Sequence, residues 1–424
     1  MDAVVLEVLG LVREQGWLAD RALEVVLRRQ KQLYSAERRA ASEALYGVVR
    51  AQGRLEWSLG RKAGIAELYA AALVGPAGLT TGAAERRFGL ARGALSPLAN
   101  ADARIAAIAD PVERLSAEES LPPWLAERLV AEMGLDEARL FSLAVNSRAP
   151  LTVRTNLLRA TREDLRKQLA EEGVESEPTS LSPWGLVLDG HANAFGLQAF
   201  KSGLFEIQDE GSQLIALACG ARPGMKVVDA CAGAGGKSLA LAAEMRNRGE
   251  ILALDVDQDR LDEARRRARR AGVDNLRTRV IPAGPEADPA LDDQAGKADV
   301  VLIDAPCSGL GTLRRKPDAR WRLGPRDPER FAATQKELVS RFSRLVKPGG
   351  RLVYATCSVT RAEDEEVAEV AAALPGFAPL PLEKTLGPGP ARAAGAAGAA
   401  GNELRLWPHR HGTDGFFVAA FERR

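Results

Sequence analysis

The chain has 424 residues, 46% hydrophobic and 27% charged, which is the composition of folded globular domains and excludes a disordered or disulfide-stapled chain. One domain usually spans roughly 100–200 residues, so we expect two or three domains. The formal net charge is only +1, from 58 basic and 57 acidic residues, and therefore overall charge does not indicate a nucleic-acid partner.

Three features predict a cytoplasmic protein without a membrane segment. No apolar run reaches the roughly 18 residues of a membrane span, and the first apolar stretch contains Glu7 in place of the features of a secretory signal. Cys231, Cys307 and Cys357 each lie in a Gly- or Pro-containing motif, which favours reduced thiols over a disulfide framework. Cys219 is expected to be a buried apolar residue.

Residues 1–142 have the apolar periodicity of helices. Apolar side chains recur at three- and four-residue spacing with charges between them, as at Leu23, Val26 and Leu27. A pair of prolines precedes the periodic stretch 124–133, as expected where one helix ends and another begins. These patterns predict a helical bundle.

Residues 143–204 predict a small α+β unit. Short strand-like segments at 151–154 and 186–188 flank one helical segment at 162–172. The change from helical to strand periodicity marks the domain boundary.

Residues 205–424 predict an α/β domain with a mainly parallel sheet. Helix-length segments separate four predicted strands, 226–229, 251–255, 300–304 and 351–355. Such alternation is typical of right-handed βαβ crossovers. The Gly-, Ala- and Pro-rich segment 387–401 is expected to be a mobile surface loop.

Basic residues gather in the segments 28–39, 265–270 and 314–322. The last surrounds Trp321, and an aromatic ring among arginines is typical of surfaces that stack on unpaired bases. The middle segment shares its predicted helix with acidic residues, so we interpret it as a solvated helix face.

The first predicted strand of the α/β domain leads into the sequence DACAGAGGKSLALA (229–242). Its glycines let the backbone approach a ligand, and the following helix N-terminus offers free N–H groups. The next strand ends at Asp255, where a carboxylate can accept hydrogen bonds from ribose hydroxyls. The pattern fits a nucleoside cofactor, but its spacing alone does not separate a methyl-donor site from a dinucleotide site or a structural turn.

Two further motifs each place a cysteine just after a predicted strand. They are DAPCSGLGTLRRKPDARWR (304–322) and YATCSVTRAEDEEV (354–367), with Cys307 and Cys357 respectively. Ligands bind at this edge of open α/β sheets. A single cysteine is commonly a small buried hydrophobe, but two at corresponding strand ends beside Asp304 indicate chemistry.

With these motifs the sequence resembles the NOL/NOP/Sun family of RNA cytosine-5 methyltransferases, most closely its bacterial RsmB-type ribosomal RNA enzymes. The resemblance extends from LADRALEVVLRR and SEALYGVVR near the start to LRLWPHRHGTDGFFVAAF at the end. It implies a helical antiterminator-like RNA-binding domain at 1–142, a small α+β linking domain at 143–204 and a class I (Rossmann-like) methyltransferase domain at 205–424. Deleting residues 1–140 is then expected to spare cofactor binding and weaken RNA binding.

The resemblance also implies roles for individual residues. Cys357 is the nucleophile, Cys307 is needed to release product, and Lys237 and Asp304 contact the target cytosine. The cofactor is S-adenosylmethionine, with Asp255 and Asp304 lining its pocket and the base pocket. Its methionine end is held by Cys231, Ala232, Gly233, Ala234, Gly235, Gly236 and Lys237.

The expected reaction explains why a thiolate is needed. Carbon 5 of cytosine becomes nucleophilic only after attack on carbon 6, which a thiolate with cationic neighbours performs well; Lys237 and the 314–316 cluster are candidate cations. The expected substrate is small-subunit ribosomal RNA and the expected state a monomer. We expect no metal, because the cysteines lack CxxC pairing and the chain has only three histidines.

Two departures from the family pattern leave alternatives open. Ala234 replaces the usual proline of the glycine loop, and Ala283 occupies the apparent place of an aspartate after the third strand. Loss of that carboxylate is expected to weaken cofactor binding unless Glu286 or Asp288 substitutes for it. A noncatalytic RNA-binding assembly factor is one alternative. A DNA cytosine-5 methyltransferase is another, but its nucleophile is the Pro-Cys cysteine and it has no equivalent of the Cys357 motif.

Overall fold

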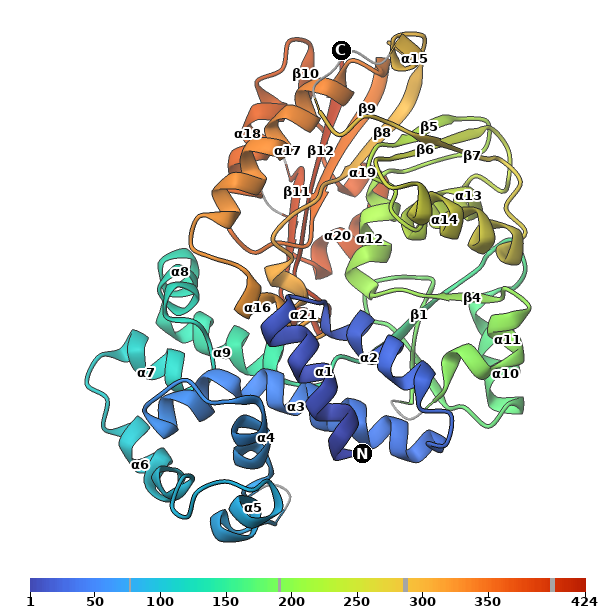
Figure 1. Cartoon of the computed structure of the whole chain (residues 1–424). Helices are drawn as coiled ribbons and strands as arrows, with labels where there is room; N and C mark the ends of the chain where they lie inside the picture. Colours follow the sequence, from blue (N-terminus) through green and yellow to red (C-terminus); the bar gives the residue numbers. More distant parts are fainter. Residues whose placement is uncertain (76–77, 190–191, 285–288, 397–400) are drawn as a thin grey trace. The chain divides into compact units, whose positions relative to one another are not determined.

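The structure of the chain is a computed structural model that describes residues 1–75, 78–189, 192–284, 289–396 and 401–424 (Figure 1). The chain divides into two compact units, a helical unit of residues 1–148 with 312–325 and an α/β unit of residues 149–311 with 326–424. Among the described residues, no helix has both the length and the apolar character needed to cross a membrane.

The helical unit confirms the expected bundle. It contains α1 (Asp2–Gln15), α2 (Ala19–Arg29), α3 (Ser35–Leu59), α4 (Ile65–Leu73), α5 (Thr81–Arg87), η1 (Ser96–Asn100), α6 (Ala101–Ala106), α7 (Pro111–Glu118), α8 (Pro123–Met133), α9 (Leu135–Asn146) and α16 (Ala319–Arg322). Its core forms because the apolar stripes of α1, α2 and α3 face one another, with Val8, Val26 and Leu45 fully buried.

Residues 312–325 interrupt the α/β unit in sequence but pack inside the helical unit. Trp321 lies against the helical core, and its Nε1 donates a hydrogen bond to the Val49 carbonyl at 2.9 Å. The Arg320 side chain is fully buried and donates to Asn146 Oδ1 at 2.8 Å. The prediction that Trp321 and its arginines form an RNA-stacking surface is therefore wrong, because the indole and the Arg320 guanidinium complete a core.

The predicted α+β unit is a four-stranded antiparallel sheet in the order β2-β3-β1-β4. Its elements are β1 (Leu151–Thr155), α10 (Arg162–Glu171), β2 (Ser176–Pro178), β3 (Gly185–Leu188), η2 (Ala194–Gly196), α11 (Gln198–Lys201) and β4 (Phe205–Ile207). Val153, Leu165 and Phe205 lie in its core. Because β4 pairs with β1, this sheet extends to residue 207.

The expected class I architecture, a mainly parallel sheet, is confirmed. The strands run in the order β10-β12-β9-β8-β5-β6-β7, and β11 pairs with β12. Strands β9, β8, β5, β6 and β7 pair in parallel, and β10, β11 and β12 antiparallel. Their bounds are β5 (Lys226–Asp229), β6 (Glu250–Asp255), β7 (Leu276–Val280), β8 (Ala298–Asp304), β9 (Val346–Thr356), β10 (Phe377–Pro379), β11 (Glu403–Leu406) and β12 (Phe416–Arg423).

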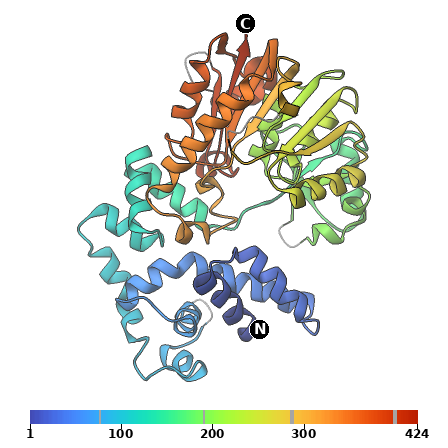
Figure 2. The same ribbon diagram turned by 45° about the horizontal axis from the view of Figure 1, so that its top comes forward.

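Helices cover both faces of this sheet, because alternate strand residues point to opposite sides (Figure 2). One face packs against α12 (Glu210–Ala218), α13 (Gly236–Glu244), α14 (Gln258–Ala271), α19 (Glu383–Leu386) and α20 (Pro388–Ala393). The other packs against α17 (Asp327–Ser343) and α18 (Glu365–Ala372). The short helices α15 (Pro289–Asp292) and α21 (Pro408–His411), and η3 (Leu310–Thr312), lie in connecting segments.

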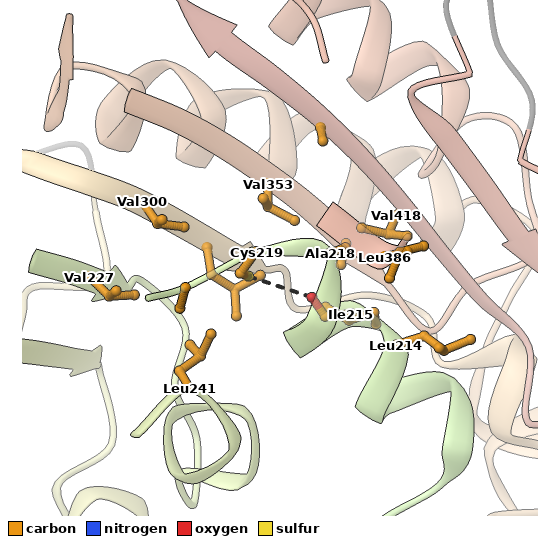
Figure 3. Close-up of a cluster of buried hydrophobic side chains, with 14 of the residues drawn as sticks. Leu214, Ile215, Ala218, Cys219, Val227, Leu241, Val300, Val353, Leu386 and Val418 are labelled. Carbon is orange, nitrogen blue, oxygen red and sulfur yellow. Dashed lines mark hydrogen bonds between the residues drawn. The ribbon is translucent and has the colours of Figure 1, made fainter. Parts of the chain in front are cut away.

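The hydrophobic core between the sheet and the helices α12, α13, α14, α19 and α20 tests two expectations. Cys219 is fully buried there among aliphatic side chains, as predicted, and its thiol faces the Ile215 carbonyl at 3.5 Å (Figure 3). The expected surface loop at 387–401 is wrong for its first part, since α20 forms there and Ala391 is fully buried. Small side chains let this helix pack closely. Residues 397–400 lie outside the described part of the chain.

The turn between β5 and α13 depends on two glycines with positive φ. Gly233 has φ +53° and Gly235 has φ +78°, values in the left-handed region that favours glycine. A Cβ added at Gly235 would lie 2.8 Å from the Ala264 Cβ of α14, whereas a Cβ at Gly233 would meet nothing within 4 Å. The turn is therefore close-packed at Gly235 and open at Gly233.

We expect Gly235→Ala to lower the free energy of unfolding of the α/β unit by about 2–4 kcal/mol, because left-handed strain and a steric clash add. Gly233→Ala is the matched control, with strain alone and a loss of about 1–2 kcal/mol. Urea unfolding measures both. Equal losses for the two variants would contradict the close packing at Gly235.

Trp321→Ala should lower the free energy of unfolding of the helical unit by about 2–4 kcal/mol, because the indole fills part of that unit's core. Hydrogen exchange of the α3 amides at increasing urea concentration reports this unit separately. Leu143→Ala removes a large side chain that is 52% exposed and should change the value by less than about 0.5 kcal/mol. Unchanged exchange in Trp321→Ala would contradict its place in the core.

Candidate functional site

The predicted site residues meet at the carboxyl edge of the parallel sheet. Asp229 at the end of β5 pairs in register with Leu302 of β8, and Asp304 at the end of β8 pairs with Ala355 of β9. The glycine loop and both cysteine motifs follow these strand ends directly. Their convergence results from strand register, as expected for ligand sites in open α/β sheets.

The two cysteines lie in contact, with Cys307 Sγ 3.3 Å from Cys357 Sγ. The Cys357 carbonyl accepts a hydrogen bond from the Gly311 N–H at 2.9 Å, which ties one cysteine loop to the other. The hydrogen bond to Cys357 and burial raise the pKa of Cys307 well above its ordinary value, and the negative charge of Glu363 adds to this. Cys307 therefore holds its proton and can donate it toward the Cys357 sulfur.

Lys237 and Asp304 form an ion pair at this edge, with Nζ 2.6 Å from Oδ2. Burial opposes the charge of Lys237, but Asp304 and, more weakly, Cys357 raise its pKa, so the ammonium stays charged. The structure thus places the Lys237–Asp304 ion pair and the Cys307–Cys357 contact at the same edge of the sheet, and the roles expected for these residues stay predictions. The other candidate cations, residues 314–316, belong to the helical unit.

Asp255 organises the glycine loop. Its Oδ2 accepts a hydrogen bond from the Gly233 N–H at 2.8 Å, and its Oδ1 accepts one from the Asp257 N–H at 2.9 Å. Each carboxylate oxygen has a second lone pair, so these bonds leave Asp255 able to accept ribose hydroxyls. The side chain both shapes the loop and offers acceptors to a ligand.

Two arginines that sequence reasoning missed hold the other side of this loop. Arg267 of α14 donates to the Ala234 carbonyl at 2.8 Å, and Arg154 of β1 donates to the Gly236 carbonyl at 2.7 Å. Burial lowers the pKa of Arg154 to about 10, which still leaves it charged at neutral pH. The buried Glu206 pairs with Arg267 at 2.9 Å. These contacts fix the loop where Ala234 replaces the more rigid proline.

The basic segment 265–270 is therefore only partly the solvated face that we predicted. Arg265 and Arg266 form exposed ion pairs within their own helix. Arg267 and Arg270 turn the other way and pair with Glu206. Their three-residue spacing places them on one side of the helix, but the sequence does not show that the buried Glu206 carboxylate lies against that side.

Buried polar groups at the loop fit a nucleoside cofactor. Asp229 Oδ2 accepts a hydrogen bond from Ser238 at 2.6 Å, whereas its buried Oδ1 has no hydrogen-bond partner among the described residues. Burial raises the pKa of Asp229 to about 6. The open space beside Gly233 admits a ligand close to the backbone, and Val256, 56% exposed directly after Asp255, offers an apolar surface for a flat ring.

The remaining expectations concern the third strand and metals. Ala283 is exposed after β7, and Glu286 and Asp288, its possible substitutes, lie outside the described residues. In the part of the chain that the structure describes, no group of three or more His, Cys, Asp or Glu side chains is arranged to hold a metal ion.

Comparison with known proteins identifies the family. Residues 216–422 match the family described as 16S rRNA methyltransferase RsmB/F, and residues 121–194 match the ferredoxin-like domain of RsmF/B-like methyltransferases. The chain is 35% identical over 320 residues to the probable ribosomal RNA small subunit methyltransferase B of Bacillus subtilis, covering 75% of this chain and 70% of that protein. It is 31% identical over 311 residues to the corresponding protein of Synechocystis, covering 73% and 68%.

The crystal structure of PH0851 is also similar, with a TM-score of 0.79 and 28% identity over 99% of this chain and 97% of that one. Identity above 30% over more than two thirds of the Bacillus and Synechocystis proteins is decisive. The chain belongs to the 16S rRNA methyltransferase RsmB/F family, a family of S-adenosylmethionine-dependent enzymes.

Proposed function

We propose that this protein methylates carbon 5 of a cytosine in small-subunit ribosomal RNA through a transient bond between Cys357 and the base. The contact between the Cys307 and Cys357 sulfur atoms carries the proposal, because a two-cysteine reaction needs both at one base. The names of the relatives, ribosomal RNA small subunit methyltransferases, support the choice of RNA.

In the first step the Cys357 thiolate bonds to carbon 6 of the cytosine, and the ring gains an enamine-like carbon 5. The charged Lys237 stabilises the thiolate before attack, and the Lys237–Asp304 pair offers a donor toward the ring as negative charge develops there. Bound S-adenosylmethionine supplies the methyl group that carbon 5 accepts. Residues 231–237, Asp255 and Asp304 hold that cofactor and the base.

In the second step Cys307 removes the proton from carbon 5, and elimination breaks the bond between carbon 6 and Cys357. Cys357 changes from a thiolate to a neutral thioether before this step, and this loss of negative charge favours ionisation of Cys307. Once Cys357 is a thioether, its charge and its hydrogen bond no longer raise the pKa of Cys307, whereas burial and the charge of Glu363 still raise it. Cys307 must give its own proton to solvent before it can take the proton from carbon 5.

The motif pattern disfavours the DNA-enzyme alternative. That mechanism uses the Pro-Cys cysteine, here Cys307, as nucleophile and has no equivalent of the Cys357 motif. A noncatalytic scaffold predicts that the cofactor does not bind, which calorimetry with S-adenosylmethionine tests directly.

We also propose that the helical unit binds the RNA. Deleting residues 1–140 is a poor test of this role, because residues 312–325 would lose the core against which Trp321 packs. Substitution of exposed basic residues on α2, such as Arg28, tests it without disturbing that core.

Asp255→Ala should weaken binding of S-adenosylmethionine by roughly ten- to hundredfold, because the ribose loses a charged acceptor and the glycine loop loses the anchor of the Gly233 N–H. Calorimetry measures the dissociation constant. Asp257→Ala is the matched control, since this neighbouring carboxylate caps α14 and does not contact the loop. An unchanged constant in Asp255→Ala would remove Asp255 from the cofactor site.

Substitution of either cysteine by alanine should stop the reaction, but at a different step for each. Cys357→Ala should abolish methylation and any covalent protein–RNA adduct, because no bond to carbon 6 can form. Cys307→Ala should permit attack and methylation but stall elimination, leaving an adduct that resists denaturant and migrates slowly in a gel. The adduct should need S-adenosylmethionine to accumulate. An adduct that survives in Cys357→Ala and is lost in Cys307→Ala would reverse the assignment.

A further inference from the structure

A single buried carboxylate receives hydrogen bonds from both cysteine loops. Glu363 is fully buried in the segment before α18. Its Oε1 accepts from the Ser308 N–H at 2.7 Å, and its Oε2 accepts from the hydroxyls of Ser308 and Ser358, each at 2.5 Å. Ser308 directly follows Cys307, and Ser358 directly follows Cys357. Glu363 is therefore joined to each loop one residue from its sulfur.

Further contacts fix the loops on the opposite side of each cysteine. Gln335 of α17 donates to Glu363 Oε1 at 3.2 Å and to the Pro306 carbonyl at 3.0 Å, just before Cys307. Thr356, just before Cys357, donates to Asp364 Oδ1 at 2.5 Å. Apolar packing alone defines the rotation of a loop poorly, whereas these directional bonds define it well.

We propose that Glu363 is a positioning residue, which sets the 3.3 Å separation of the Cys307 and Cys357 sulfur atoms through Ser308 and Ser358. The carboxylate suits this role because it accepts several bonds at once, and charge-assisted bonds are shorter and stronger than neutral ones. It also places a negative charge near Cys307, which contributes to the raised pKa of that thiol. Its catalytic consequence rests on the proposed function, but the sulfur separation does not.

Disulfide formation measures the sulfur separation directly. Diamide takes two electrons and two protons from two thiols and leaves a disulfide, which mass spectrometry of the Cys307 and Cys357 peptides detects. We expect the full-length protein to join these cysteines quickly. Glu363→Gln keeps the shape of the side chain and removes its charge. Loss of that charge by itself favours the Cys307 thiolate and faster joining, so the expected slowing of at least about tenfold reports the weakened bonds between the two loops.

Two variants make the result specific. Ser358→Ala removes the link to the Cys357 loop alone and should slow the joining by roughly three- to tenfold, which keeps the test informative if Glu363→Gln folds poorly. Glu210→Gln is the matched control: this buried carboxylate in the same unit accepts the N–H groups of Leu181 and Ser182 and contacts neither cysteine loop. It should change the rate by less than about twofold.

Single-turnover methylation adds a second readout. Glu363→Gln should lower the rate of the chemical step while the KM for RNA and the affinity for S-adenosylmethionine remain near wild type, a split that general misfolding would not give. Unchanged joining rates in Glu363→Gln and Ser358→Ala, or a wild-type protein whose two cysteines do not join, would overturn the proposal. Slowed joining in a protein that methylates no RNA would support the positioning role and refute the proposed function.

Discussion

The register between β8 and β9 is the constraint on which the site depends. Asp304 lies opposite Ala355, so Cys307 and Cys357 each lie a few residues beyond the same line across the sheet. A strand rises about 3.3 Å per residue, and a slip of two residues would move one sulfur by roughly 6.6 Å, beyond any contact with the other. A slip of one residue is prevented differently, because it would turn every buried strand side chain to the wrong face. Hydrophobic packing on both faces of the sheet therefore fixes the chemistry at its edge.

Register alone places the backbone, and buried polar groups then place the reacting atoms. Glu363, Asp364 and Arg154 are all buried, and each makes directional hydrogen bonds to a loop of the site. Burying such groups costs several kcal/mol unless their bonds are made, so any loop position that breaks those bonds is strongly disfavoured. The free-energy penalty for leaving a buried charged group without its hydrogen bonds therefore restricts each loop to one conformation. Apolar side chains of the same size would pack well but would tolerate many loop rotations.

Patterns within one segment of the sequence predict their structures well. The strand that ends at Asp304 and the one that ends just before Cys357 follow from runs of apolar residues bounded by turn residues, and the ends of parallel strands must meet at one edge. The positions of the Trp321 and Arg267 side chains cannot be predicted in this way, because each depends on a hydrogen-bond partner distant in the chain. Trp321 donates to the Val49 carbonyl and Arg267 to the Ala234 carbonyl. The same holds for Ala391, which lies in a low-complexity segment but is fully buried in helix α20. The residue pattern within one segment carries no information about such long-range contacts.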